Sequence, residues 1–484
     1  MRLYTIIIRP LILLPYLLLI CNLNMYAQSS SNDRDCYSEA LFSPGILNTI
    51  HIDLSDSTRQ SMQRDAILKK DYKCSVTING ELYKNASIRT KGASSLNAVV
   101  QMGSDRFSFM ITLNKYIKGQ KYHGLSKISL NNNIWDATQM KDYVVYDMCR
   151  YIGLPAPLAN YASIFLNGSY LGCYLLVEPV NKDFCKRNYP NEVSNIYKPH
   201  HNLSYIGVNT EDYAGIRDFA KVNGNDSSVL RVVEALRSVD MGLDIEKHID
   251  IECLMKYLAL QTIVVNFDGL TGKESHNYYL REANGIISLI PWDYNLAWGG
   301  YPDEEESETD FDVKKWLEWY DSLSQEQQDS IMAIERERNK TEITKIVNFP
   351  IDTPFSIELS KRTFFMDLLS IEQYKKRYYY YLTALAKNYI LGGSLKNRIS
   401  LINKEIDPIV STEPNAFYTK EQFKKAVETF IIVLEKRAQS VLGQIDGRIP
   451  STWEKQVSNP HTLIDCIDID INDLGGVLLG RDIE

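Results

Sequence analysis

The sequence predicts an α+β fold with a strand-rich first half and a helical second half. Apolar and polar residues alternate at residues 50–54 and again at 74–78, and this period of two indicates strands. From about residue 228 the apolar residues recur at the helical period of 3.6 instead. With 484 residues, 44% of them hydrophobic, the chain can bury a large core in two or three domains.

The individual elements follow from the same two periods. Further strands are expected at residues 86–91, 107–113, 127–130, 163–166 and 172–178. The pairs Asn79-Gly80 and Asn167-Gly168 are hairpin turns. One helix interrupts the strands at residues 137–152, and Gly153 ends it. The second half predicts helices at residues 229–237, 251–265, 371–389, 395–406 and 420–445.

The N-terminus has the features of a secretory signal. Arg2 and Arg9 flank the start of an apolar run, and a small-residue cleavage site precedes Gln28. Prolines leave only about ten unbroken apolar residues, too few for a spanning helix. We therefore expect a signal peptide at 1–27, a linker at 28–38 and an exported protein that is periplasmic, secreted or at the cell surface. Lipidation at Cys21 is the alternative, although Ile20 before it is large.

Charge and cysteine usage exclude other classes. Lys and Arg total 53 against 61 Asp and Glu, a net charge of -8, so no electrostatic case for binding nucleic acid exists. Seven dispersed cysteines follow the signal without a CxxC spacing, so no zinc or redox motif is predicted. Their pairing stays open.

A hairpin in the second half carries the most informative polar residues. Asp268 follows the end of a predicted helix, and two strand-like runs flank Asn284-Gly285. A tight turn at that pair places residue i opposite residue 569 minus i. Asn277 and Asp293 then meet at the open end, where the loop with Asp268 enters. His276, next to Asn277 on a strand, is expected to point to the other face.

Three converging oxygen-bearing groups suit Mg²⁺, which takes few protein ligands and shares its shell with water and phosphate. The order Asp, Asn, hairpin, Asp is that of a protein-kinase site, although no HRD or DFG occurs. A buried carboxylate that only closes a turn is the structural alternative.

Several ordered blocks resemble the CotH kinase family, the spore coat protein H-like secreted kinases. The hallmark segment is similar at residues 277–280 and 290–299, and further blocks agree at residues 89–95, 130–132, 167–178, 196–199, 350–354 and 416–419. Together they cover roughly residues 45 to 450. The resemblance implies an atypical two-lobed, protein-kinase-like fold that uses ATP and Mg²⁺ to phosphorylate Ser residues of proteins.

By this resemblance Asp268 is the catalytic carboxylate, and Asp293 and Asn277 are the metal ligands. Orienting the phosphates of a nucleotide requires a cation with a carboxylate partner, and Lys198 with Glu178 is the candidate pair. Lys91 is a competing candidate for the cation.

The strand that carries Lys91 supplies two further candidates. Arg89 is a candidate phosphate contact, with simple surface exposure as the alternative. The small residues at 92–95 could cradle phosphate through backbone N–H groups, or form only a turn. Ile287 stands where many relatives carry a Trp that could stack on adenine, which puts nucleotide preference in question.

The predicted organisation is a β-rich N-lobe at 39–198, a helical C-lobe at 199–450 with the catalytic hairpin at 266–299, and a C-terminal tail at 451–484. The predicted function is ATP- and Mg-dependent phosphoryl transfer to Ser or Thr of a secreted or surface protein, without a stable membrane span. Two alternatives stay open. One is a non-catalytic binding module on the same scaffold, and the other is a metal-dependent nucleotidyl transferase or hydrolase.

Overall fold

A computed structural model describes residues 36–272, 275–301, 319–320, 322–355 and 363–477. The predicted signal peptide, Cys21 and most of the predicted linker lie outside these residues. Contacts divide the chain into Met1–Cys36 and Tyr37–Glu484, and every helix and strand of the described residues lies in the second unit. No helix in the described ranges is long and apolar enough to cross a membrane.

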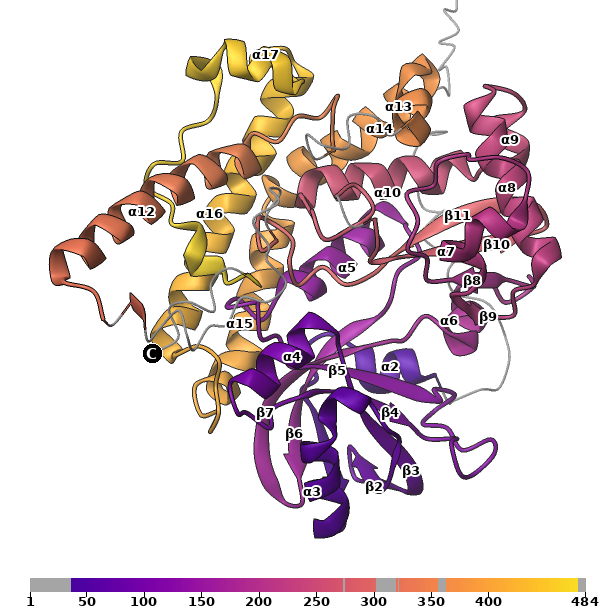
Figure 1. Cartoon of the computed structure of the whole chain (residues 1–484), viewed down its shortest axis with the longest axis vertical. Helices are drawn as coiled ribbons and strands as arrows, with labels where there is room; N and C mark the ends of the chain where they lie inside the picture. The colour runs from indigo at the N-terminus through magenta and orange to yellow at the C-terminus, as the bar shows by residue number, and fades with distance from the viewer. Residues whose placement is uncertain (1–35, 273–274, 302–318, 321, 356–362, 478–484) are drawn as a thin grey trace, which may run out of the picture. The chain divides into compact units, whose positions relative to one another are not determined.

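Seven strands form a closed barrel in the order β1-β2-β3-β4-β5-β7-β6 (Figure 1). Their bounds are β1 (Asn48–Asp53), β2 (Tyr72–Ile78), β3 (Glu81–Lys91), β4 (Ser108–Thr112), β5 (Lys127–Asn131), β6 (Ala159–Leu166) and β7 (Ser169–Val177). All seven predicted strands are therefore confirmed. Neighbours pair antiparallel except β1 and β6, which are parallel and close the barrel. Alternating apolar side chains such as Ile50, Ile52 and Val76 fill its interior.

The turns of the three hairpins have the predicted chemistry. Both residues of Asn79-Gly80, Asn167-Gly168 and Asn284-Gly285 have positive φ, between 47° and 89°. Such turns match the twist of the flanking strands, and Asn and Gly tolerate this conformation best.

The expectation of a single helix in the first half is wrong. Besides α5 (Lys141–Ile152), this half contains α2 (Tyr37–Phe42), α3 (Asp56–Arg64), α4 (Ser94–Gln101) and α6 (Lys182–Asn188). These helices have six to nine residues, so each is too short to show a clear helical period in the sequence. The structure is still a mixed α+β fold with a β-rich N-terminal part.

The C-terminal part is helical, as predicted. Its helices are α7 (Ala214–Arg217), α8 (Asp226–Asp240), α9 (Ile245–His248), α10 (Ile251–Val264), α12 (Gln325–Val347), α13 (Thr363–Ser370), α14 (Glu372–Thr383), the π-helix η4 (Ala384–Ile390), α15 (Ser394–Val410), α16 (Lys420–Ile445) and α17 (Trp453–Ser458). Beyond α16, Ile471 and Leu474 remain in the core.

A second, four-stranded sheet belongs to this part. It has the order β11-β10-β8-β9 and consists of β8 (Asn195–Tyr197), β9 (Ala220–Val222), β10 (Tyr278–Ala283) and β11 (Ile286–Pro291). Strand β8 precedes the predicted lobe boundary at residue 198, yet its partners β9 and β10 both follow that boundary. Helix α5 contacts β6 of the barrel on one side and α10 on the other (Figure 1).

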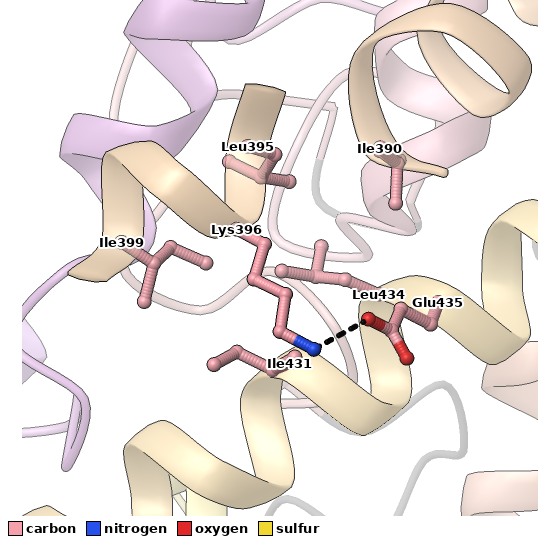
Figure 2. A pocket seen from close by; sticks show the side chains of 7 residues that line it. All are labelled: Ile390, Leu395, Lys396, Ile399, Ile431, Leu434 and Glu435. Atoms are coloured by element: carbon pink, nitrogen blue, oxygen red, sulfur yellow. Dashed lines mark hydrogen bonds and ion pairs between the residues drawn. The ribbon is translucent and has the colours of Figure 1, made fainter. Parts of the chain in front are cut away.

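A pocket lies between η4, α15 and α16 (Figure 2). Its lining is mostly aliphatic, with one ion pair at 3.4 Å between Lys396 Nζ and Glu435 Oε1. None of the predicted site residues lines this pocket.

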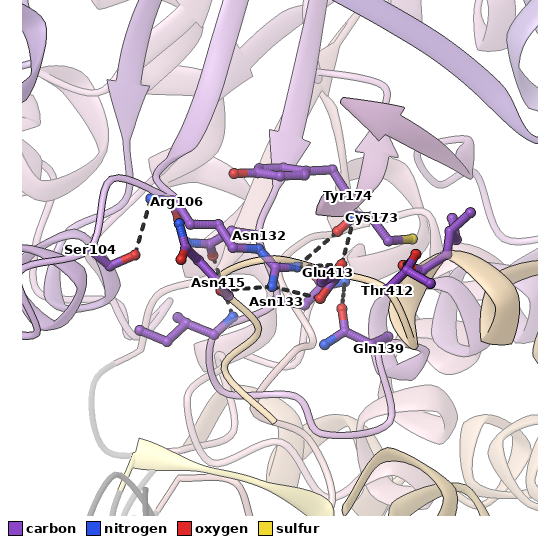
Figure 3. A network of polar contacts seen from close by, with 12 residues as sticks. Ser104, Arg106, Asn132, Asn133, Gln139, Cys173, Tyr174, Thr412, Glu413 and Asn415 are labelled. Atoms are coloured by element: carbon purple, nitrogen blue, oxygen red, sulfur yellow. Dashed lines mark hydrogen bonds and ion pairs between the residues drawn. The ribbon is translucent and has the colours of Figure 1, made fainter. Parts of the chain in front are cut away.

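A buried ion pair joins the barrel to the helical part (Figure 3). Arg106, just before β4, donates from Nη1 and Nη2 to the two carboxylate oxygens of Glu413, just after α15, at 2.7 and 2.8 Å. Both side chains are at most 1% exposed. The backbone N–H of Cys173 on β7 also donates to Glu413. Breaking such a pair would leave an uncompensated buried charge, so it fixes the two parts together.

Candidate functional site

The hairpin of β10 and β11 has the predicted register. Tyr278 pairs with Pro291, and Ala283 pairs with Ile286. Every pair in this ladder has the partner expected from a turn centred on Asn284-Gly285. The segment with Asn277 and the segment with Asp293 therefore both lie at the open end of the hairpin.

Asp268 lies in the loop that follows α10 and contacts this open end. The side-chain nitrogen of Asn277 donates to Asp268 Oδ2 at 2.7 Å and to the Asp268 carbonyl at 3.0 Å. Asp268 is only 8% exposed. The predicted convergence of Asp268 and Asn277 is therefore confirmed, and only the Oδ1 atom of Asn277 could take a cation.

His276 lies on the same side as Asn277, which corrects the expectation that it faces away. Its Nε2 atom is 3.2 Å from Asp268 Oδ1. The expectation assumed strand alternation, but the ladder begins only at Tyr278, and Ser275 and Asn277 have φ of 53° and 55°. Left-handed residues on both sides of His276 break the alternation. As a result, the two carboxylate oxygens of Asp268 contact different side chains.

Asp293 sits just after β11 in a left-handed conformation, with φ of 65°. Helix α5 holds its backbone. The N–H of Asp293 donates to the Tyr146 hydroxyl at 3.2 Å, and the N–H of Tyr294 donates to Asp142 Oδ1 at 2.6 Å. Burial, and then the charge of Asp293, raise the pKa of Asp142 to about 7.

The carboxylate of Asp293 differs from the other acidic groups of the site. It is partly exposed, and within the described part of the chain no hydrogen bond or ion pair occupies its oxygens. Lys91 and Asp142 are close enough for their charges to interact with it. A carboxylate whose oxygens have no protein partner suits a bound metal cation.

One predicted cation, Lys91, interacts with this carboxylate, and a second, Lys198, interacts with Lys91. Lys91, at the end of β3, donates from Nζ to Asn131 Oδ1 at 2.5 Å. Burial lowers the pKa of Lys91, the charge of Asp293 raises it, and the charge of Lys198 lowers it again. Lys198 Nζ lies 5.8 Å from the centre of the Trp292 ring, next to Asp293. Lys91 and Lys198 therefore share one electrostatic site and need not compete for the role.

Further basic residues extend this site, and the sequence analysis missed them. Burial and the charge of Lys198 lower the pKa of Lys221 on β9 and of His200. Arg89, which shares a face of β3 with Lys91, adds to the effect on Lys221. No motif marks either residue in the sequence. His200 lies two residues after Lys198, whereas Lys221 comes close to Lys198 only through the pairing of β9 with β8.

The hydrogen-bond partners of Glu178 do not include either candidate lysine. Its side chain is 0% exposed, and it accepts hydrogen bonds from Arg187 Nε and Nη2 at 3.1 and 2.5 Å. The Tyr37 hydroxyl and the backbone N–H of Leu158 donate to it as well. Its partner is therefore Arg187, not Lys198, and its oxygens are fully used.

The small-residue segment at 92–95 forms the turn from β3 into α4. Gly92 has φ of 104°, and a Cβ there would lie 2.5 Å from Ser95 Oγ, so the turn requires glycine. No side chain caps the start of α4. A phosphate on these first N–H groups and a purely structural turn both fit this geometry.

Ile287 faces the protein core. It is 2% exposed and belongs to the core of the helical part. An aromatic residue at this position would therefore stack within the core of this chain, not on adenine. The departure at Ile287 gives no reason to expect weakened nucleotide binding.

The donor set fits Mg²⁺ only when phosphate shares it. No group of three or more His, Cys, Asp or Glu side chains in the described ranges could hold a metal ion. Asp293 and the Asn277 Oδ1 atom offer two hard oxygens, and Mg²⁺ is commonly held by one or two carboxylates plus substrate phosphates. The cations Lys91 and Lys198 supply the charge that such phosphates need.

The barrel and the helical part together present interacting lysines, the oriented carboxylate of Asp268 and the carboxylate of Asp293, whose oxygens have no partner in the described ranges. The sequence profile of the CotH kinase protein family matches residues 88–441, well over half of the chain. The chain belongs to the CotH kinase family, which confirms the resemblance noted in the sequence. Membership of a kinase family implies the use of ATP.

The chain is similar to a spore coat protein and to a chain of a solved complex. Inner spore coat protein H of Bacillus subtilis (strain 168) is 21% identical over 196 residues, which are 38% of this chain and 53% of that protein. The chain thus spans about half the length of this curated relative. A chain in the solved complex of the Shewanella oneidensis MR-1 toxin–antitoxin system HipA, HipB and its operator DNA is 12% identical, with a TM-score of 0.29, over 70% of this chain and 59% of that one. A TM-score this low says nothing about the site.

Proposed function

We propose that this protein transfers the terminal phosphoryl group of ATP, with Mg²⁺, to Ser or Thr hydroxyls of another protein. One observation carries the proposal. Asp268, held by Asn277 and His276, lies at the same hairpin end as Asp293, whose carboxylate has no protein partner in the described ranges and faces Lys91. The barrel and the helical part would act as the two lobes of an atypical kinase-like fold.

Each side chain has a distinct role in this proposal. Asp268 would orient the acceptor hydroxyl and accept its proton. Asp293 and the Oδ1 atom of Asn277 would hold Mg²⁺, which neutralises phosphate charge when bound. Lys91 and Lys198 would bind the phosphates, and Arg89 and Lys221 would add positive potential beside them. Glu178 has no role at the phosphates here, since Arg187 holds it.

The acceptor and the compartment follow from different observations. Family membership supports a protein acceptor, and the Arg-flanked apolar run before Gln28 supports export. N-terminal sequencing of the protein from its natural host should start near Gln28. An intact Met1 on protein from the cytosol would contradict export, and a lipid on Cys21 would favour the alternative anchor.

Trapping the product tests the reaction. The full chain and its Asp268→Asn variant are incubated with Mg²⁺, a mixed library of Ser- and Thr-containing peptides and ATP labelled on either the α- or the γ-phosphate. Phosphoserine or phosphothreonine made only by the wild type supports the proposal. AMP on the acceptor would instead indicate a nucleotidyl transferase, free phosphate alone a hydrolase, and no product a binding module.

A further inference from the structure

We propose that Asp142 is a positioning residue that links the phosphate-binding cation Lys91 to the metal-binding carboxylate Asp293. The inference rests on the proposed function, because it concerns how the same site is held in shape. Asp142 is 2% exposed on α5, and it forms no ion pair within the described part of the chain. Burying a carboxylate without a salt bridge costs free energy of folding. The two groups that form hydrogen bonds with Asp142 indicate what it contributes to the site.

The first neighbour is the backbone on both sides of Asp293. Asp142 and Tyr146 are one helical turn apart and share a face of α5. Tyr146 accepts the N–H of Asp293, and Asp142 accepts the N–H of Tyr294. These two N–H groups belong to the two peptide planes that flank the Asp293 Cα atom. Together the two hydrogen bonds hold Asp293 in its left-handed conformation and so fix where its carboxylate points.

The second neighbour is the amide of Asn131 on β5. Asn131 Nδ2 donates to Asp142 Oδ2 at 3.4 Å, while Asn131 Oδ1 accepts from Lys91 Nζ at 2.5 Å. Both side-chain oxygens of Asp142 accept hydrogen bonds in this arrangement, so the NH₂ group of Asn131 must lie on the Asp142 side. The carbonyl oxygen of Asn131 is then left facing Lys91. Asp142 thus sets the orientation of the amide that holds the lysine.

One side chain therefore touches the supports of both halves of the site. The Lys91 side belongs to the barrel, and the Asp293 side belongs to the hairpin of the helical part. The spacing between the phosphate-binding cation and the metal-binding carboxylate then depends on α5, which lies between the two parts (Figure 1). Misplacement of such groups by about 1 Å can cost on the order of 10²-fold in rate.

The test uses four full-length variants in steady-state kinetics with ATP and Mg²⁺. Asp142→Asn offers an NH₂ group to Asn131 and forces its amide to turn, so the KM for ATP should rise on the order of 10–100-fold. The double variant, which combines Asn131→Asp with Asp142→Asn, reverses the polarity of the pair. The carboxylate that it places on β5 would accept from both Lys91 and the new amide on α5, so the KM should return most of the way to that of the wild type.

Tyr146→Phe removes only the acceptor for the Asp293 N–H. It should raise the Mg²⁺ concentration for half-maximal rate several-fold, on the order of the effects of other outer-sphere partners, while the KM for ATP at saturating Mg²⁺ stays the same. Tyr143→Phe is the matched control, since Tyr143 is a buried tyrosine of the same helix that stacks on Tyr161. It should leave both parameters unchanged.

The outcomes separate this inference from the proposed function. If the wild type makes no phosphorylated product, the proposed function fails and the inference with it. If the wild type is active but Asp142→Asn keeps the wild-type KM, or the double variant is no better than Asp142→Asn, the positioning role is wrong. If Asp142→Asn does not fold, the double variant and Tyr146→Phe test the inference instead. A wild-type Mg²⁺ dependence in Tyr146→Phe overturns it. A KM for ATP in the double variant that does not return towards the wild-type value overturns it as well.

Discussion

Two carboxylates that the sequence marks as site candidates lie in opposite surroundings. Glu178, at the end of β7, is fully buried, and four donors fill its oxygens, two of them from Arg187. Asp293, at the end of β11, is partly exposed, and within the described ranges its oxygens have no partner, although its backbone is held in place. A carboxylate with all its lone pairs used stabilises a fold, whereas one that is positioned but unpaired is available to a ligand.

Asp268 should give the largest effect, and the effect should be on the rate alone. Asp268→Asn keeps the size of the side chain but removes the charge that accepts the proton of the acceptor hydroxyl. Phosphoryl transfer should fall on the order of 10²- to 10⁴-fold, while the stabilisation of the fold by ATP and Mg²⁺ persists. Rate assays paired with thermal melts in both ligands check this. A wild-type rate would remove Asp268 from the mechanism, and an unfolded variant would make it a structural residue.

Glu178 should behave in the opposite way, with a loss of stability. Glu178→Gln leaves the half-buried charge of Arg187 without its counter-ion, which should lower the free energy of unfolding by up to about 3 kcal/mol. Urea denaturation without ligands measures it. Glu435→Gln is the control, because its ion pair with Lys396 is solvent-exposed and should contribute little. Equal effects of the two variants would contradict the comparison.

Asp293→Asn should affect the binding of Mg²⁺ and leave the stability of the unliganded protein nearly unchanged. Because no protein partner within the described part is lost, the unliganded variant should unfold at nearly the same urea concentration as the wild type. The Mg²⁺-dependent part of the stabilisation by ATP should disappear, about 2.7 kcal/mol when the ligand is at a hundred times its Kd. Thermal melts in ATP with and without Mg²⁺ measure it. An unchanged Mg²⁺ effect would show that another group holds the metal.

Lys141, the first residue of α5, is buried as Glu178 is, but its charged group has no hydrogen-bond partner in the described ranges, as is the case for Asp293. Its side chain is 0% exposed. Burial lowers its pKa to about 8, while the charge of Asp136 raises it. In the unfolded chain a lysine binds its proton up to pH of about 10.4, so between pH 8 and that value the unfolded state binds more protons and stability rises with pH.

The Lys141→Met variant should lose this pH dependence. Relative to the wild type, its free energy of unfolding should fall by at most about 1.4 kcal/mol per pH unit above pH 8, and the difference should be constant below pH 8. Urea denaturation of both proteins from pH 7 to pH 9.5 tests the slope. Parallel curves over the whole range would show that the folded-state pKa of Lys141 is ordinary.

Ile287 should give the smallest effect. Ile287→Val removes one buried methyl group from the core and should cost about 0.5–1.5 kcal/mol of stability. The affinity for ATP, measured by calorimetry, should not change, because the side chain faces the core. A clear loss of ATP affinity without loss of stability would return this position to the nucleotide site.

Local patterns in the sequence were enough for the barrel strands, the register of the hairpin and the helices α8, α10, α14, α15 and α16, but the long helix α12 was not predicted. Asn284-Gly285 specifies a tight turn, and a tight turn fixes every pair in the ladder behind it. The convergence of Asp268 and Asn277 followed from that register. Helices as short as α4 could not be predicted, because a helix of two turns has too few residues to show a period.

Tertiary contacts decided the rest of the site. Nothing near Glu178 in the sequence distinguishes Arg187 from Lys198 as its partner, because the choice depends on how α6 packs against β7. The direction of His276 depends on two left-handed residues outside the ladder. Asp142 looked like an ordinary charged residue of a helix, and only the packing of α5 against the hairpin brings it to Asp293.

The parallel pairing that closes the barrel has a consequence for synthesis of the chain. Strand β1 must pair with β6, where Asn48 lies opposite Ala162, so its second edge stays open until more than a hundred further residues have been made. At a translation rate of about 5–20 residues per second this takes roughly 6–20 s. An open edge with alternating apolar residues is prone to pair with other chains. The open edge of β1 is therefore exposed during that interval, well before the hairpin of β10 and β11 has been made.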